Sequence, residues 1–427
     1  MADHSLEDFA RQQVPQEKTV SGLRIALIVV GIMITLPAFL TSAQVGQALG
    51  LIRGATAIGA GSVILASFGC LIAVVGARSR LSTYMIIQFP FGRTGAKVVS
   101  MVIGITLLGW FGVNGFLFGQ AVQSSLSDLF AIDSGMQVPV AFGSILVIAT
   151  TVYGFRALDR LAVVSVPILL TALIAIVYFA THNTSMDEFL STEGTGMTMG
   201  IAISAVVGAF MVGLTLLPDL CRYAHDSRHG VIASCLSFAV GYPLVLIVSA
   251  IPALATGESD FMLIMMGLGM GVSAMLILVF ATWTTNISNL YSTSLLLATV
   301  FTRIDRWKLT IGAGIIGTVF AGMGILDHFV SFLLFLGIAI PPIAGIYVAD
   351  FFFVRGQDYD TASLRSEPPV SYPAFIAWVG ASAVAQATAS EVFTMTSIPS
   401  CDAILVSFGL YLFLRKGLGI GTARAAP

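Results

Sequence analysis

The residues best suited to bind an ion in this sequence are uncharged. Residues 281–286 (ATWTTN) carry neighbouring hydroxyls on Thr284 and Thr285, and residues 31–37 (GIMITLP) place a glycine and a proline inside another apolar segment. Proline removes a helical hydrogen bond and clashes with the preceding turn, so it frees backbone carbonyls. Carbonyl and hydroxyl oxygens together suit a cation such as sodium. The alternative for Thr284 and Thr285 is a structural role, since such hydroxyls also bond to their own helix.

A second group of residues suits a flat, hydrogen-bonding ring. Trp110 lies inside an apolar segment, away from the membrane interfaces where Trp usually settles, and Asn114 follows one helical turn later on the same face. Phe210 lies in residues 208–213 (GAFMVG) of a later apolar segment. An indole face with an amide beside it predicts a heterocycle site, which Phe210 would close from the other side. The alternative for any one aromatic side chain is ordinary contact with lipid or core.

Composition shows which elements must position these residues. The chain has 427 residues, of which 57% are hydrophobic and 10% charged, and its mean hydropathy is +0.94. Ordinary soluble domains are about 45–50% apolar and about 25% charged. A soluble enzyme, a nucleic-acid binder and a disordered regulator are therefore excluded, and a polytopic membrane protein is predicted. Its four cysteines are scattered, with no spacing typical of disulfides or metal sites.

Apolar segments long enough to cross a bilayer recur along the chain, and we predict twelve transmembrane helices. With the N-terminus inside, 19 of the 20 Lys and Arg fall on the cytoplasmic side and only Arg53 lies outside. Basic residues favour cytoplasmic loops, so we expect both termini in the cytoplasm of a multi-pass plasma-membrane protein. The predicted spans are 24–49, 55–76, 98–125, 137–153, 161–180, 197–217, 230–255, 264–299, 309–326, 329–348, 371–390 and 402–414.

Interruptions in the first and sixth spans predict the architecture. The sixth carries Gly208 and Gly213 and ends at Pro218, and it runs opposite to the first. Two broken helices five spans apart in opposite orientation are typical of an inverted-repeat transporter. We predict a tail at 1–22, a ten-helix core at 23–350 with repeats at 23–182 and 196–350, a linker at 351–370, two appended helices at 371–415 and a tail at 416–427.

These stretches resemble the nucleobase/cation symporter-1 family, in which the bacterial cytosine permeases are the most similar group. The shared stretches follow in order through the first ten spans: residues 89–92 (FPFG), residues 109–113 (GWFGV), Asp219 with Arg222, residues 283–286 (WTTN) leading to 290–291, and residues 339–342 (AIPP) leading to 349–350. The resemblance implies an all-α, leucine-transporter-type fold with 5+5 inverted repeats. It also implies sodium-driven uptake of a purine, pyrimidine or related ring by alternating access.

The resemblance also implies site residues. The sodium ligands would be the carbonyls of Gly31, Ile34 and Ala281 and the hydroxyls of Thr284 and Thr285. The substrate would lie between two aromatic rings, with polar contacts from the first, third and sixth spans. The residues assigned to it are Trp110, Phe210, Asn114, Thr35, Ala209 and Val212, with Asn289 as a further candidate.

The sequence departs from the cytosine permeases where specificity is decided. A Gln in those permeases is Leu107 here, and two Ser residues are Ala209 and Val212. Asn114 replaces one of the lost polar groups, because relatives that take hydantoins or allantoin carry an amide at that position. A site loses discrimination for a polar edge when its hydrogen-bonding groups are removed, so we expect a substrate of this class other than cytosine.

Further polar residues have more than one interpretation. Asp219 and Arg222 form a candidate inner gate, which Asp350 would join, or a solvated helix end. Asn286 and Asn289 either face substrate or support helix packing. The alternative function is a sodium symporter of the same fold for an amino acid or a vitamin precursor such as hydroxymethylpyrimidine. We expect no catalytic residues, no cofactor besides sodium as coupling ion, no nucleic acid and no obligate protein partner, and we disfavour a membrane enzyme or a passive channel.

Overall fold

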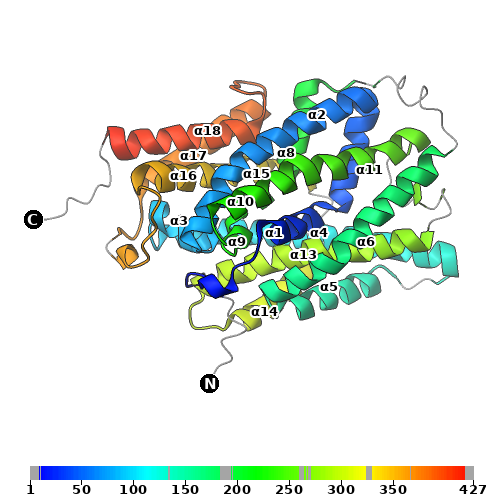
Figure 1. Cartoon of the computed structure of the whole chain (residues 1–427), viewed down its shortest axis with the longest axis horizontal. Coiled ribbons are helices and arrows are strands. Elements are labelled where there is room, and N and C mark those ends of the chain that lie inside the picture. The colour runs from blue at the N-terminus through cyan, green and yellow to red at the C-terminus, as the bar shows by residue number, and fades with distance from the viewer. Residues whose placement is uncertain are drawn as a thin grey trace, which may run out of the picture.

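The structure is a computed structural model of the chain, shown in Figure 1. It describes residues 9, 11–132, 135–182, 194, 196–258, 264–265, 267, 271–323, 329–365 and 367–418. Within these residues the regular secondary structure is helical, apart from one isolated bridge between Val20 and Ala224. The all-helical prediction is confirmed for this part of the chain.

The helices follow the apolar segments of the sequence, and most are separated by short turns. The helix Leu36–Ser79 covers parts of the first two predicted spans and leaves helical geometry between them at Gly50 (φ 75°, ψ 172°). The α-helices are α1 (Gly22–Met33), α2 (Leu36–Ser79), α3 (Thr83–Phe91), α4 (Gly95–Phe130), α5 (Gln137–Thr151), α6 (Phe155–Thr181), α8 (Met199–Thr215), α9 (Pro218–Cys221), α10 (Ser227–Ser234), α11 (Tyr242–Thr256), α13 (Gly271–Val300), α14 (Arg306–Gly322), α15 (Phe329–Ala339), α16 (Pro341–Ala349), α17 (Tyr372–Ala389) and α18 (Pro399–Leu412). The 3-10 helices are η2 (Gln16–Lys18) and η6 (Ser363–Arg365), and the π-helices are η3 (Cys235–Gly241), η5 (Asp350–Val354) and η7 (Phe413–Gly417).

The first apolar segment is broken where the sequence predicts it. Helix α1 ends at Met33, and Ile34 and Thr35 are extended (φ/ψ −80°/92° and −140°/156°) before α2 begins. Pro37 then lies in the first turn of α2, where its missing N–H has no helical acceptor to lose. The Thr35 side chain accepts a hydrogen bond from the Ala38 N–H and so caps the new helix (3.1 Å).

The sixth segment is interrupted later than predicted. Helix α8 runs without a break through residues 208–213 to Thr215, and the chain turns at Leu216 and Leu217 before the short helix α9. The expected interruption at Gly208 and Gly213 is therefore wrong. A glycine costs a helix only about 1 kcal/mol, whereas Pro218 removes an N–H and clashes with the turn before it, so the break lies next to the proline.

Helix α13 is central to the packing of the bundle. It contacts α4 most extensively and also packs against α1, α5, α6 and α14. Helix α2 packs against α8 and α11. At one edge, α17 and α18 lie beside each other and against α16 (Figure 1). The two ends of the first break are therefore held between helices that are distant in sequence.

The outer surface of the bundle is apolar. Within the part of the chain that the structure describes, five helices are long and apolar enough to cross a membrane by length and composition: Pro37–Ser79, Gly95–Ser124, Phe155–Thr181, Ser227–Thr256 and Phe335–Val354. Large apolar side chains such as Ile145, Ile174 and Val379 are exposed on the surface. Exposed apolar surface on this scale is what a lipid environment covers. The chain is a multi-pass membrane protein, and the count of twelve crossings stays a prediction.

Candidate functional site

The break after α1 lies against α13. The Thr284 hydroxyl oxygen is 3.0 Å from the Gly31 carbonyl oxygen of α1 and 3.0 Å from the Ala281 carbonyl oxygen of its own helix. It also lies 2.9 Å from the Phe280 carbonyl oxygen, the ordinary bond back to the preceding turn. A hydroxyl donates only one proton, so three carbonyls around one hydroxyl form a cluster of oxygens with more acceptors than donors.

The neighbouring hydroxyl extends this cluster. The Thr285 hydroxyl lies 3.2 Å from the Ile32 carbonyl oxygen. Gly31 and Ile32 belong to the last turn of α1, whose carbonyls lack an intrahelical donor. Ile34 is fully buried in the extended segment directly after α1. The structure thus brings four of the five expected sodium ligands, Gly31, Ala281, Thr284 and Thr285, to the region where α1 meets α13, and it places Ile34 at the break itself.

Charged groups are absent from the contacts described for this oxygen cluster. Among the described residues there is also no group of three or more His, Cys, Asp or Glu side chains that could hold a metal ion. Neutral oxygens are hard ligands, which suit alkali and alkaline-earth cations better than transition metals. The chemistry of this set fits the sodium ion that was expected from the sequence.

Helix α4 carries the candidate stacking residue. Trp110 is half-buried, and Asn114 one turn later is buried with its amide nitrogen 2.9 Å from the Trp110 carbonyl oxygen. This bond leaves the side-chain carbonyl of Asn114 as the group able to accept a bond from a ligand. Helix α13 reaches the same part of α4, since the Asn286 amide nitrogen lies 3.1 Å from the Phe111 carbonyl oxygen.

The aromatic ring that packs on Trp110 comes from an unexpected helix. The ring of Phe332 in α15 meets the indole edge to face, with centroids 5.8 Å apart and planes at 70°. A methyl group on Gly109 would lie 2.5 Å from this phenyl ring, so the glycine makes room for it. Sequence reasoning missed Phe332, and the only signal for it was the glycine directly before Trp110.

The expected partner Phe210 has other neighbours. It is half-buried on α8, with ring centroids 5.5 Å from Phe238 and 5.7 Å from Tyr242. Val212 is buried and Ala209 is exposed on the same helix. Helix α15 packs against both α4 and α8, so Phe332 lies on the helix that contacts both the helix of Trp110 and the helix of Phe210.

Two other candidate residues for substrate contact lie at the edges of this region. Thr35 is half-buried in the break, where its hydroxyl oxygen accepts the Ala38 N–H, and among the described residues no acceptor takes its hydroxyl proton. Asn289 is half-buried on α13, with its amide nitrogen 3.2 Å from the side-chain oxygen of Asn286. Thr35 thus lies in the break next to the oxygen cluster, and Asn289 lies on α13, the helix that carries Thr284 and Thr285.

At the predicted cytoplasmic end, Arg222 joins several elements. Its guanidinium lies 2.7 Å from the Tyr291 hydroxyl of α13 and 3.0 Å from the carbonyl oxygen of Phe9, and it stacks over the Tyr223 ring at 4.8 Å. Arg222 contacts Asp219 through the backbone carbonyl of that residue (3.1 Å). The residue predicted as half of an inner gate therefore connects α9 to α13 and to the N-terminal segment.

Asp219 is buried beside it. Its carboxylate accepts a hydrogen bond from the Thr83 N–H at the start of α3 (2.7 Å). Burial raises the pKa of the Asp219 carboxyl above its ordinary value, while the positive charge of Arg222 and the Thr83 N–H favour the carboxylate. Both residues of the predicted pair are buried, so the interpretation as a solvated helix end is wrong.

Asp350 does not join this pair. It is fully buried and lies 2.7 Å from the Tyr411 hydroxyl, 3.0 Å from the Tyr359 hydroxyl and 3.2 Å from the Arg355 guanidinium. Glu367 completes the group with an oxygen 2.8 Å from Arg355. The expectation that Asp350 joins the gate is therefore wrong, because a separate ion pair on the C-terminal side of α16 satisfies its charge.

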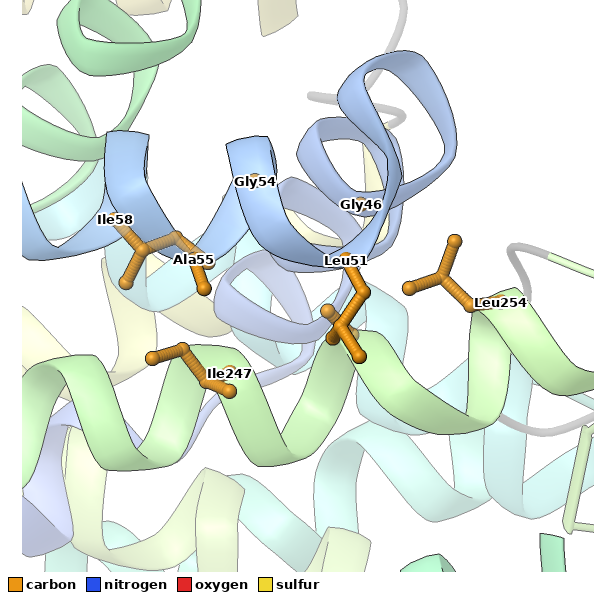
Figure 2. Close-up of a pocket in the computed structure, with 8 residues that line it drawn as sticks. Gly46, Leu51, Gly54, Ala55, Ile58, Ile247 and Leu254 are labelled. Atoms are coloured by element: carbon orange, nitrogen blue, oxygen red, sulfur yellow. The ribbon is translucent and has the colours of Figure 1, made fainter. Parts of the chain in front are cut away.

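A shallow apolar hollow between α2 and α11, shown in Figure 2, does not match a heterocycle site. Its lining residues are Gly46, Leu51, Gly54, Ala55, Ile58, Ile247, Ala250 and Leu254. None of these side chains can hydrogen-bond, so this hollow cannot orient a polar ring.

Comparison with known proteins identifies the group to which these features correspond. Residues 13–410 match the model of a family described as permease for cytosine/purines, uracil, thiamine, allantoin. The cytosine permease of Escherichia coli (strain K12) is 27% identical over 420 residues, which are 98% of this chain and 96% of the relative.

Solved structures show the same fold. Mhp1, a nucleobase-cation-symport-1 family transporter in a closed conformation with bromovinylhydantoin bound, matches with a TM-score of 0.82 at 20% identity, covering 95% of each chain. A sodium-coupled sialic acid symporter in a substrate-bound outward-open state matches with a TM-score of 0.73 at 12% identity, covering 97% of this chain and 94% of the other. At these identities the likeness concerns the fold, and the expected leucine-transporter-type architecture is confirmed.

Proposed function

The chain belongs to the family of permeases for cytosine/purines, uracil, thiamine and allantoin, and from this premise we propose that it imports a nitrogen heterocycle together with sodium. The substrate class is a nucleobase or a related ring of the purine, pyrimidine, hydantoin or allantoin type. Uptake proceeds by alternating access, with both termini of the chain in the cytoplasm.

One observation carries the proposal. The Thr284 and Thr285 hydroxyls of α13 meet the carbonyls of Gly31 and Ile32 at the end of α1. Backbone carbonyls at the C-terminal end of a discontinuous helix are ligands with which inverted-repeat transporters hold sodium, and hydroxyls on a facing helix add further neutral oxygens. The set has no carboxylate, so a proton relay through these residues has no acid to use.

The substrate site lies beside this cluster in our proposal. Trp110 supplies the stacking face, and Phe210 supplies the opposite wall. Hydrogen bonds come from Asn114, Thr35 and Asn289. Ala209 and Val212 of α8 line the site. An aromatic face binds any planar ring, whereas the placement of amides and hydroxyls selects one ring. The comparison proteins support this class, since one is a cytosine permease and another holds bromovinylhydantoin.

At the cytoplasmic end, we propose that Asp219 and Arg222 act in an inner gate. Arg222 reaches across to Tyr291 of α13 and to the backbone of Phe9. Arg24 of α1 reaches Asp159 of α6 on the same side, with Nε 3.1 Å from the carboxylate. These contacts join the broken first helix and α9 to α6 and α13, and they must separate when the inner side opens.

Transport in liposomes tests the proposal. Purified protein is expected to accumulate a radiolabelled heterocycle when an inward sodium gradient is imposed, and not when choline replaces sodium. The ligand is chosen first by a thermal-shift panel of cytosine, uracil, purines, hydantoins, allantoin, hydroxymethylpyrimidine and amino acids with and without sodium, because a bound ligand raises the melting temperature. Sodium-independent uptake would contradict the coupling, and stabilisation by amino acids alone would contradict the substrate class.

A further inference from the structure

Asn286 lies between the two candidate sites and is part of neither. It directly follows Thr285 on α13 and is 2% exposed. Its amide nitrogen lies 3.1 Å from the carbonyl oxygen of Phe111, the residue after Trp110. Its side-chain oxygen accepts a hydrogen bond from the Asn289 amide (3.2 Å). Both polar groups of this amide are thus used inside the protein.

The helix geometry explains how one short segment reaches two partners. Consecutive residues of an α-helix point about 100° apart, because a turn contains 3.6 residues. Thr284 and Thr285 therefore face α1, where they meet the Gly31 and Ile32 carbonyls, and Asn286 faces α4. A single turn of α13 holds the end of the broken helix on one side and the backbone beside Trp110 on the other.

The Asn289 bond fixes which way the Asn286 amide points. Because Asn289 donates to the oxygen of Asn286, the nitrogen of Asn286 is directed at Phe111. The Phe111 carbonyl has a second lone pair besides the one used in its own helix. Because Asn286 is 2% exposed, this bond is shielded from bulk solvent, and it holds the backbone of α4 in one register against α13.

We propose that Asn286 is a positioning residue that couples the sodium site to Trp110. This inference rests on the proposed function. Sodium bound between α1 and the Thr284 and Thr285 hydroxyls fixes this turn of α13, and the amide of Asn286 transmits that position to the α4 backbone and so to the indole face. Coupling between two binding sites is reciprocal, so sodium and substrate each raise the affinity for the other by the same factor.

The first experiment measures this factor directly. Substrate dissociation constants of the full-length protein are determined with saturating sodium and with choline, using the heterocycle selected by thermal shift. Asn286→Leu keeps a side chain of similar size without polar groups, and we expect the sodium-dependent gain in affinity to fall at least fivefold. Asn286→Gln keeps the amide and is expected to restore part of the gain. An unchanged gain in Asn286→Leu would overturn the proposal.

A matched control separates coupling from loss of packing. Trp283 of α13 donates from its indole nitrogen to the Thr150 hydroxyl of α5 (3.0 Å), a bond that anchors the same turn of α13 to a different helix. Thr150→Val removes this anchor and is expected to leave the sodium-dependent gain within twofold of wild type. If Thr150→Val and Asn286→Leu reduced the sodium-dependent gain in affinity equally, any loosening of α13 would be enough to reduce it. That result would overturn the specific role of Asn286.

A second measurement keeps Asn286 in place and does not depend on the folding of Asn286→Leu. With 5-fluorotryptophan incorporated, Trp283 beside the sodium site and Trp110 beside the substrate site give separate fluorine resonances, assigned by Trp283→Phe and Trp110→Phe. Without substrate, sodium is expected to shift both. A shift of Trp283 alone would overturn the coupling and leave the sodium site standing, whereas no shift of Trp283 together with sodium-independent uptake would contradict the proposed function itself.

Discussion

The hydroxyl of Thr284 lies 3.0 Å from the carbonyl oxygen of Gly31, although 253 positions separate the two residues in the chain. The contact joins the end of a broken helix to the middle of an intact one. An unpaired helical carbonyl is ordinarily satisfied by water or a cap. Here a hydroxyl of α13 reaches it, which makes the junction a place where an ion with several oxygen ligands can bind.

Removing either hydroxyl should weaken sodium binding. We expect Thr284→Ala and Thr285→Ala each to lower the apparent sodium affinity about tenfold or more, because an interaction with a charged group contributes about 1.5–3 kcal/mol. The measurement is the sodium concentration that gives half-maximal uptake. Thr318→Ala is the matched control, since its hydroxyl bonds to the Gly314 carbonyl of its own helix α14 (2.7 Å). A similar loss in the control would contradict the assignment.

Removing the indole should weaken substrate binding. Stacking of a base on an aromatic side chain contributes about 1–3 kcal/mol, so Trp110→Ala should raise the substrate dissociation constant about 5- to 150-fold. Trp110→Phe should keep part of the affinity. Calorimetry in saturating sodium measures both. Trp307→Ala is the control, because this half-buried Trp lies at the start of α14 and has the Lys308 Nζ 5.3 Å from its ring centroid, outside the proposed site. Wild-type affinity in Trp110→Ala would disprove the stacking role.

Weakening the inner contact should open the cytoplasmic side more often. Tyr291→Phe removes the hydroxyl that Arg222 contacts at 2.7 Å, and a bond to a charged group contributes about 1.5–3 kcal/mol. Hydrogen exchange of α9 and of the first turns of α1 should then accelerate several-fold. Tyr242→Phe, which loses a bond to the Val206 carbonyl between α11 and α8 (3.0 Å), should not change these segments. Wild-type exchange in Tyr291→Phe would argue against the gate.

The packing of the two C-terminal helices on α16 gives a stability prediction. A methyl group at Gly345 would lie 2.1 Å from the Ser407 hydroxyl and 2.5 Å from the Ile404 carbonyl oxygen of α18. Gly345→Ala must therefore separate α16 from α18, which should cost about 1–3 kcal/mol and lower the melting temperature in detergent. Gly409→Ala on α18 meets no atom within 4 Å and should melt as wild type does. A melting temperature of Gly345→Ala equal to that of the wild type would contradict this close approach of α16 and α18.

The sequence by itself determined the helices and the first break. Apolar runs of membrane-crossing length and the position of Pro37 are local signals, because hydropathy and a missing N–H act where they occur. The same local logic misplaced the second break. Gly208 and Gly213 looked like interruptions, but a membrane helix keeps all its internal hydrogen bonds at a glycine, and the chain turns only next to Pro218.

Only the tertiary structure decided which residues meet. Gly31 with Thr284, Asn286 with Phe111 and Trp110 with Phe332 are pairs from different helices, and helix crossing and rotation fix such pairs through packing of the whole bundle. Asp350 illustrates the same limit, since its sequence position near the cytoplasmic end could not reveal that Tyr359, Tyr411 and Arg355 surround it. A buried charge takes the partners that packing brings to it, and these lie up to 61 positions away.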